Sequence, residues 1–421
     1  MSPRRGRNPH WFAPAPGVCA PNGTILVIEM RGTLLFLLTV TAAFADSKPG
    51  DEGTPEFEAA TKLVKQLGAA RYATREAAAK QILEMRGAAI PALTAGTSST
   101  DEEIRNRCKS LLPQVKAADW KYRAEAFLAD PGGRYKNDPV LFADYEKAVG
   151  KLDDGGRKLF AEMLRADLDL LVLAVGRPDE ANERLRDRCR TLMVRDGKGH
   201  VPVPGKVGEL AILFFLHERQ RIPTPWEGNE HPAFQLANPA LADGVAAKDI
   251  GKALRRIVVR WAERRAPDDA AAHQFFALAA GKLPIPEAVP LLTRLAKDKK
   301  AVMLNVRVPA VWALGRIGTP EAQASLEELM PDRTKVAPGF PTGIITLGDY
   351  ALAALAEARG KAPSDYGLVT NRTGGPLPLR ATAGGVSVTL TLYWFRDDDS
   401  QQDGLNKKKH DAETSRAKSG R

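Results

Sequence analysis

A nine-residue pattern of apolar and polar positions recurs along the chain. It begins with an apolar residue and an arginine, has a small residue three positions after the arginine, and ends with two apolar residues. Offsets of three, four, seven and eight fall on one face of an α-helix, so the apolar and small positions form one stripe with the arginine at its edge. Gap-free copies occupy residues 104–112, 185–193 and 306–314.

The small residue of each copy gives the spacing of the pattern. Arg75 and Ala78 begin a fourth copy, and Ala351 belongs to a fifth copy that lacks the arginine. The other pairs of arginine and small residue are Arg105 and Cys108, Arg186 and Cys189, and Arg307 and Ala310. The small positions 78, 108, 189, 310 and 351 are 30, 81, 121 and 41 residues apart, which fits units of roughly 30 to 40 residues with degenerate copies between them. A small residue in the stripe lets a neighbouring helix approach closely, so the pattern predicts an all-α fold, an α-solenoid of stacked helical hairpins.

Two segments carry a family resemblance. Residues 75–112 and residues 306–318, with the helix expected to start at Pro320, resemble the HEAT-like repeat superfamily, particularly the short repeats first described in phycobilin lyases. The chain also resembles a group of exported bacterial HEAT-repeat proteins that have an N-terminal repeat, a helical middle and a closing stretch like residues 349–368. The resemblance implies architecture and implies no activity.

Composition shifts divide the chain into six regions. Beyond residue 368, the alternation of Val and Leu with Ser and Thr over residues 386–392 predicts a strand, with residues 377–382 as its candidate partner. Within the helical middle of the chain, we expect a loop over residues 196–206. The regions are an N-terminal extension with a signal peptide (1–45), N-terminal HEAT-like repeats (46–118), an irregular helical middle (119–245), C-terminal HEAT-like repeats (246–368), a linker with the strand (369–395) and a disordered charged tail (396–421).

The N-terminal region has the features of a secretory signal. Met30 and Arg31 precede an apolar run over residues 33–44, and Ala43 and Ala45 provide a small-x-small cleavage site. The run is too short to cross a bilayer, which takes about 20 apolar residues. We therefore expect a signal peptide from Met30 to Ala45, translation starting at Met30 rather than Met1, and a mature chain that is periplasmic or extracellular and has no stable membrane span.

Charge and cysteine content narrow the functional classes. The 61 basic and 51 acidic residues give a net charge of +10, but the two signs are interleaved, which is weak support for a nucleic-acid groove. Three cysteines cannot form a disulfide framework, and Cys19 lies in the extension. We expect Cys108 and Cys189 to be buried free thiols that act as small apolar residues.

Few residues suggest catalysis or metal binding. His217 and Glu218 resemble the start of a zinc-protease helix, but Arg221 stands where the second histidine would be required. Glu227, Glu230 and His231 lie together on a proline-rich stretch, for which a solvated loop is favoured over a cation site. We expect no catalytic residue, no cofactor and no bound metal.

The arginines leave two interpretations open. A column of Arg105, Arg186 and Arg307 along a solenoid would bind phosphates, whereas pairing of each arginine with an acid or a carbonyl of the adjacent turn would join one repeat to the next. The second interpretation is favoured, because export removes the usual nucleic-acid targets.

The favoured function is a non-enzymatic scaffold whose helical-repeat surface binds a protein partner. The alternatives are a small-ligand-binding protein of the lyase or chaperone kind and, less favoured, a nucleic-acid binder. The sequence does not identify the partner.

Overall fold

The computed structural model describes the chain from Thr54 onward, in segments. The described residues are 54–130, 138–150, 153–195, 200–219, 231–265, 269–283, 285–299, 304–336, 346–366, 368–369, 378–383, 386–391 and 394–395. The predicted signal peptide and the predicted disordered tail both lie outside the described residues. None of the described helices combines the length and the apolar content that crossing a bilayer requires.

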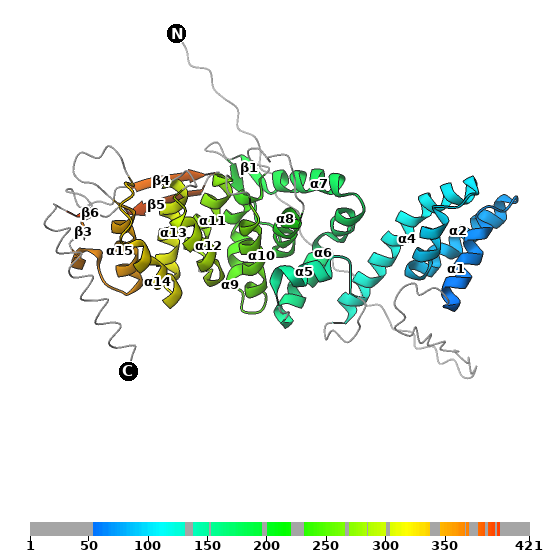
Figure 1. Ribbon diagram of the computed structural model, residues 1–421, viewed down its shortest axis with the longest axis horizontal. Helices are drawn as coiled ribbons and strands as arrows, with labels where there is room; N and C mark the ends of the chain where they lie inside the picture. The colour runs from blue at the N-terminus through cyan, green and yellow to red at the C-terminus, as the bar shows by residue number, and fades with distance from the viewer. Residues whose placement is uncertain are drawn as a thin grey trace, which may run out of the picture. The chain divides into compact units, whose positions relative to one another are not determined.

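Fifteen α-helices dominate the described part of the chain, which confirms the predicted all-α fold (Figure 1). The helices are α1 (Pro55–Gln66), α2 (Tyr72–Met85), α3 (Ile90–Gly96), α4 (Glu102–Ala129), α5 (Phe142–Val149), α6 (Asp154–Gly176), α7 (Pro178–Thr191), α8 (Val207–Arg219), α9 (Pro239–Ala246), α10 (Gly251–Glu263), α11 (Ala270–Lys282), α12 (Val289–Lys297), α13 (Leu304–Ile317), α14 (Pro320–Leu329) and α15 (Leu347–Ala358). Short 3₁₀ helices are η1 (Arg86–Ala89), η3 (Pro232–Ala237), η4 (Pro286–Ala288) and η5 (Pro363–Tyr366).

Local sequence explains where several helices begin. The Asp101 carboxylate accepts hydrogen bonds from the backbone N–H groups of Glu103 and Ile104, at 2.9 and 3.1 Å, and so starts α4. Thr346 and Asp349 form a capping box at the start of α15. Gly318, at φ 64°, ends α13 in the left-handed conformation that glycine adopts without a steric penalty.

The C-terminal helices are arranged as packed hairpins. α12 packs on α13 and α14 packs on α15, while α13 also contacts α11 and α15, and α12 contacts α14. Ten consecutive residues of α15, 347–356, are buried, as expected for a helix that is apolar on all sides. This order of contacts is that of stacked repeats, and upstream of it α6 packs on α8 and α8 on α10.

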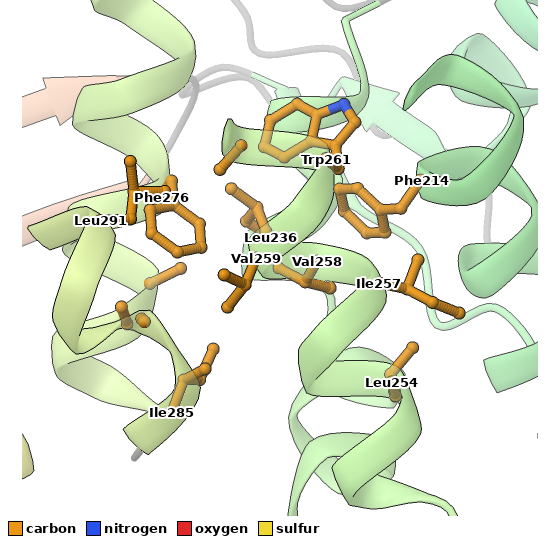
Figure 2. Packing of buried hydrophobic residues seen from close by; sticks show 14 of the residues in the cluster. Phe214, Leu236, Leu254, Ile257, Val258, Val259, Trp261, Phe276, Ile285 and Leu291 are labelled. Carbon is orange, nitrogen blue, oxygen red and sulfur yellow. The ribbon is translucent and has the colours of Figure 1, made fainter. Parts of the chain in front are cut away.

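The apolar residues form separate clusters, and α4 belongs to two of them. Cys108, Leu111 and Val115 of α4 pack with α1, α2 and α3 in an N-terminal core. Ala124 and Phe127, further along the same helix, belong to a large core that continues to α15. Figure 2 shows part of this large core, where Phe214 and Trp261 meet edge to face with ring centroids 5.2 Å apart. α4 runs without interruption through position 118, where the composition suggested a boundary.

Strands are few and short. The predicted strand is present as β5 (Val386–Thr391), which pairs antiparallel with β4 (Pro378–Ala383), close to the expected partner segment. β3 (Leu368–Val369) pairs with β6 (Trp394–Phe395). A third pair, β1 (Met193–Arg195) with β2 (His200–Pro202), was missed, because β2 falls in the stretch that we expected to be only a loop.

The packing of α11 on α13 gives a first testable prediction. A Cβ atom added to Gly281 would lie 2.1 Å from Cζ3 of Trp312, so Gly281→Ala must displace the indole ring. We expect a loss of about 1–3 kcal/mol in the free energy of unfolding, measured by urea denaturation. The control is Gly176→Ala at the end of α6, where an added Cβ meets nothing within 4 Å, and this variant should be neutral or slightly more stable. Equal stability of the two variants would contradict the close contact.

Candidate functional site

The five small residues of the recurring pattern all lie on α-helices and are buried. They are Ala78 on α2, Cys108 on α4, Cys189 on α7, Ala310 on α13 and Ala351 on α15. A Cβ atom added to Gly96 of α3 would lie 2.5 Å from the Cys108 sulfur, so the backbone of α3 approaches α4 closely at this point. Within the described residues neither Cys108 nor Cys189 forms a disulfide, and burial raises the pKa of the Cys108 thiol. These positions are structural in the described helices.

Three of the four pattern arginines donate hydrogen bonds to main-chain carbonyls that precede their own helix. Arg75 bonds to the carbonyls of residues 69 and 70 at 2.8 and 3.0 Å, and Arg105 bonds to Ser99 at 2.8 Å. Arg307 bonds to the Ala296 carbonyl in the last turn of α12, at 2.8 Å. The fourth, Arg186, is half-buried on α7. The first three guanidinium groups therefore join a helix to the turn before it, as in the favoured interpretation, and this use competes with phosphate binding.

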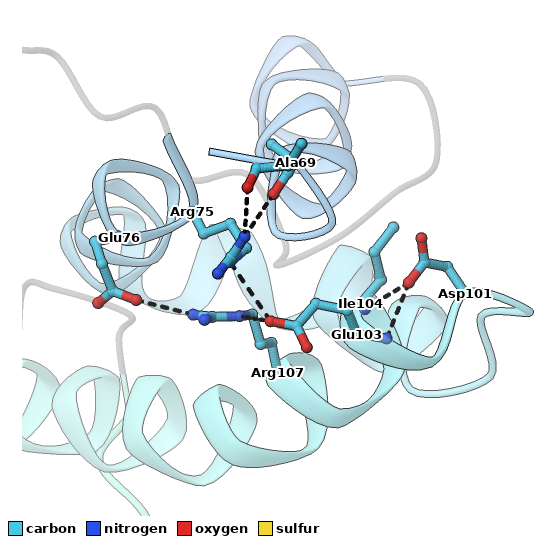
Figure 3. A network of polar contacts seen from close by, with 8 residues as sticks. Ala69, Arg75, Glu76, Asp101, Glu103, Ile104 and Arg107 are labelled. Carbon is cyan, nitrogen blue, oxygen red and sulfur yellow. Dashed lines mark hydrogen bonds and ion pairs between the residues drawn. The ribbon is translucent and has the colours of Figure 1, made fainter. Parts of the chain in front are cut away.

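Figure 3 shows how Arg75 extends into a polar network between α2 and α4. Its Nε lies 3.5 Å from the Glu103 carboxylate, which also accepts a hydrogen bond from Arg107 at 2.6 Å. Arg107 reaches across to Glu76 on α2 at 3.0 Å. The hydrogen bonds that the Arg107 guanidinium donates to the carboxylates of Glu103 and Glu76 raise its pKa. Since every charge has an opposite partner, the network aligns two helices and leaves little attraction for an external ion.

Arg307 has the most buried of these arrangements, with 4% of the residue exposed. Besides the Ala296 carbonyl, its guanidinium bonds to the Thr334 hydroxyl at 3.2 Å and forms an ion pair with Asp332. Burial raises the pKa of Asp332, but the hydrogen bonds from Thr334 and Arg307 outweigh it and hold the pKa below its usual 3.8. The group joins α12, α13 and the segment after α14.

A buried histidine cluster lies where α8, η3 and α10 meet. His217 accepts a hydrogen bond at Nδ1 from the Trp261 indole N–H, at 2.8 Å, and His231 accepts one at Nδ1 from the Ala233 backbone N–H, at 3.1 Å. The two imidazole centroids are 5.5 Å apart. Because Nδ1 is the acceptor in both rings, both histidines are neutral, with the proton on Nε2. Burial lowers the pKa of His217 well below 6.5, with Arg265 adding to the effect.

The described surroundings of this cluster are polar. His231 Nε2 lies 3.8 Å from the Asp269 carboxylate, and Arg265 donates to the His217 carbonyl at 3.0 Å. Burial is the main cause that lowers the pKa of His231 and of nearby His273. Within the segments that the structure describes, no three His, Cys, Asp or Glu residues come together to hold a metal ion.

The structure describes only part of the two histidine-containing stretches that the sequence singled out. Glu218, beside His217, pairs with Arg260 and Arg264 of α10 at 3.1 and 3.3 Å, so it is a structural acid between two helices. Of the proline-rich group, only His231 is described, and Glu227 and Glu230 lie outside the described residues. His231 is half-buried rather than on an exposed loop.

A groove of about 320 Å³ lies between α4 and the start of α5. Trp120 and Arg123 line it from α4, and residues 138–144 line the other side. Leu141, in this wall, has φ 65° and ψ 1°, a left-handed conformation that costs an L-residue about 1–3 kcal/mol. It is held by the bond from Tyr145 N–H to its carbonyl, at 2.9 Å, and by Phe142, whose ring packs 5.0 Å from that of Phe160. The groove wall therefore contains a residue in a strained conformation that contacts of α5 hold in place.

The sequence predicted neither the groove nor the cluster that His217 and His231 form with Trp261. His217 ends an apolar run that is buried on all sides as α8, and this run was the signal that His217 would be a core residue. Its partner Trp261 is 44 residues away, which no local pattern reveals. Trp120 and Asp138 belong to no motif, and only the path of the chain brings them to one groove.

Comparison with known proteins identifies the repeats. Residues 258–336 match the HEAT repeats family, a stretch that runs from within α10 past α14 and includes Arg307 and Ala310. This match confirms the predicted HEAT-like repeats in this part of the chain. A solved structure of human deoxyhypusine hydroxylase in complex with glycerol is similar at 13% identity and a TM-score of 0.21, covering 73% of this chain and 98% of that chain. No curated protein matches the sequence.

Proposed function

We propose that this protein is an exported, non-enzymatic scaffold that binds a partner protein through its helical-repeat surface. The observation that carries the proposal is the run of HEAT repeats over residues 258–336 within a continuous series of packed helical hairpins. Stacked repeats of this kind present extended surfaces, and such surfaces commonly recognise protein segments.

The arginine contacts argue for protein rather than nucleic acid as the partner. The guanidinium groups of Arg75, Arg105 and Arg307 already donate to main-chain carbonyls, so a phosphate would have to compete with these bonds. A nucleic-acid site requires several basic side chains that are free to approach the backbone phosphates.

The partner is tested by capture followed by direct binding. The chain from Asp46 onward is immobilised, incubated with an envelope fraction of the source organism, and washed at moderate salt. We expect a captured protein that, once purified, forms a complex with the chain at micromolar affinity or better by calorimetry. Recovery of a small molecule without any protein would overturn the scaffold proposal in favour of a ligand-binding protein.

Export is tested separately, by the mass of the secreted product. Expression of the full sequence in a bacterial host should yield an extracytoplasmic chain that starts at Asp46. Replacing Ala45, the residue before the cleavage point, by leucine should block processing, because the signal peptidase requires a small residue there. An unprocessed chain that stays in the cytoplasm would overturn export and leave the scaffold proposal standing.

A further inference from the structure

The groove between α4 and α5 carries three charged residues, and two of them are already neutralised. Arg123 is paired with the buried Asp119 at 2.8 Å. Asp144 accepts a hydrogen bond from Arg219 of α8 at 2.9 Å, and it also offsets the positive end of the α5 helix dipole. Within the described residues Asp138 makes no hydrogen bond or close ion pair, and Arg157 and Arg123 act on its carboxylate only at longer range.

Asp138 is also poorly solvated for a carboxylate at the surface. Although much of the residue is exposed, the groove walls partly desolvate the carboxyl and raise its pKa, against the opposing effect of Arg157 and Arg123. A desolvated anion without a partner gains more from an incoming cation than a fully hydrated one does. The groove therefore favours a positively charged ligand.

The rest of the lining suits a long side chain with a charged end. Trp120 lines the groove and is half-buried, and among the described residues its indole makes no hydrogen bond and no aromatic or cation–π contact. Pro139, Val140 and Leu141 add an apolar wall. Aromatic faces attract ammonium and guanidinium groups, and the methylene stems of lysine and arginine pack well on apolar surface.

We infer that this groove binds a lysine or arginine side chain of the partner protein, with its cationic end on Asp138 and its stem along Trp120. The occupant is an extended segment of that partner, because a groove of about 320 Å³ is larger than one basic side chain and has room for a neighbouring residue as well. The inference rests on the proposed scaffold function and specifies the chemistry of the partner.

A random library of displayed 12-residue peptides provides the probe. Selection on the immobilised full chain should enrich peptides that contain lysine or arginine, and an enriched peptide should lose affinity about tenfold when its basic residue becomes glutamine. Asp138→Asn should lower the affinity for the same peptide by a similar factor. Trp120→Ala should also lower the affinity, because the stem of the basic side chain loses the indole face. The matched control is Asp179→Asn, which removes an exposed acid of α7 that makes no hydrogen bond or ion pair with the described residues, and it should leave affinity unchanged.

Each outcome decides the matter. Enrichment of peptides without basic residues, no enrichment at all, or equal affinity for wild type and Asp138→Asn would overturn the inference. If N-acetyl-lysine methylamide alone binds as tightly as the peptides, the groove is a small-amine site rather than a docking site. If the partner captured from the envelope binds Asp138→Asn as well as wild type, the groove assignment fails while the scaffold function survives. Circular dichroism of Asp138→Asn should match that of wild type.

Discussion

Replacement of Arg307 by alanine should lower the free energy of unfolding of the C-terminal repeats by about 3–5 kcal/mol, because it leaves the Asp332 carboxylate buried without its counter-charge. The Ala296 carbonyl and the Thr334 hydroxyl would lose a donor at the same time. Hydrogen exchange of the α13 and α15 amides measures this local stability. Faster exchange should be concentrated in α12 to α15, because these helices pack around Arg307.

The control for this prediction lies on the same helix. Arg316 is exposed and makes no hydrogen bond or ion pair within the described residues, so Arg316→Ala should change stability by no more than about 0.5 kcal/mol. Adding Asp332→Asn to Arg307→Ala should recover part of the loss, since the buried charge is then gone. Equal exchange rates in Arg307→Ala and Arg316→Ala would show that the ion pair contributes nothing.

The contribution of Asp332 should also depend on pH. Its pKa is lower in the folded protein than in the unfolded chain, so the stabilisation is present above about pH 4 and is lost as pH falls through the folded pKa. The wild type should therefore lose stability in this acid range, and a protein carrying Asp332→Asn should lose less. The histidines act at higher pH, which keeps the two effects apart.

Mild acid should destabilise the region around α8 and α10 through His217 and His231. Both have a folded pKa below the unfolded value of 6.5, so their stabilisation is complete above pH 6.5 and is lost as pH falls below it. Each histidine adds a slope of up to about 1.4 kcal/mol per pH unit between the two pKa values. Protonation of Nδ1 in either ring would also turn this acceptor into a donor, which would then face the N–H of Trp261 or of Ala233.

Burial fixes the direction of this effect by lowering the pKa of both histidines, and the nearby charges modify it. Arg265 lies beside both rings and opposes protonation, whereas Asp269 at the start of α11 favours protonation of His231. Glu218 is held by Arg260 and Arg264, so it offers little compensation to His217. The net result is two neutral rings at neutral pH.

A variant with His217→Asn and His231→Asn tests this assignment. Asparagine keeps an acceptor oxygen near the position of Nδ1 but does not titrate. Urea unfolding between pH 8 and pH 5, followed by tryptophan fluorescence, should give a shallower fall in stability for this variant than for wild type. The slopes are compared rather than the absolute values, because the smaller side chains also remove packing. Parallel slopes would contradict the role of these two histidines.

The helical repeats were predictable because their signal is local. An apolar residue, a small residue and a closing apolar pair at helical spacing identified α4 and α13, and the match to HEAT repeats includes the second of these. The copy at residues 185–193 identified α7 but overran it, because α7 ends at Thr191 and Met193 begins β1. The strand at residues 386–391 was predictable from its two-residue period. β2 was not, because its three residues are too few to show a two-residue period.

The groove and the histidine cluster depend on contacts between distant residues. Asp138 and Trp120 are joined only by the return of the chain after α4, and His217 meets Trp261 only because α8 packs on α10. From the sequence, His217 could be compared only with a zinc-protease helix, an interpretation that fails because Arg221 stands in place of the second histidine. Its actual role follows from the burial of all sides of α8.

Because α4 is continuous and contributes residues to both cores, its length fixes the rotation of one core relative to the other about the helix axis. One residue inserted between Val115 and Ala124 would turn the second half of the helix by about 100° and advance it by about 1.5 Å, so that Phe127 would no longer face its own core. Seven inserted residues would nearly restore the phase, because they make close to two full turns. Natural length variation in this helix should therefore come in steps near seven.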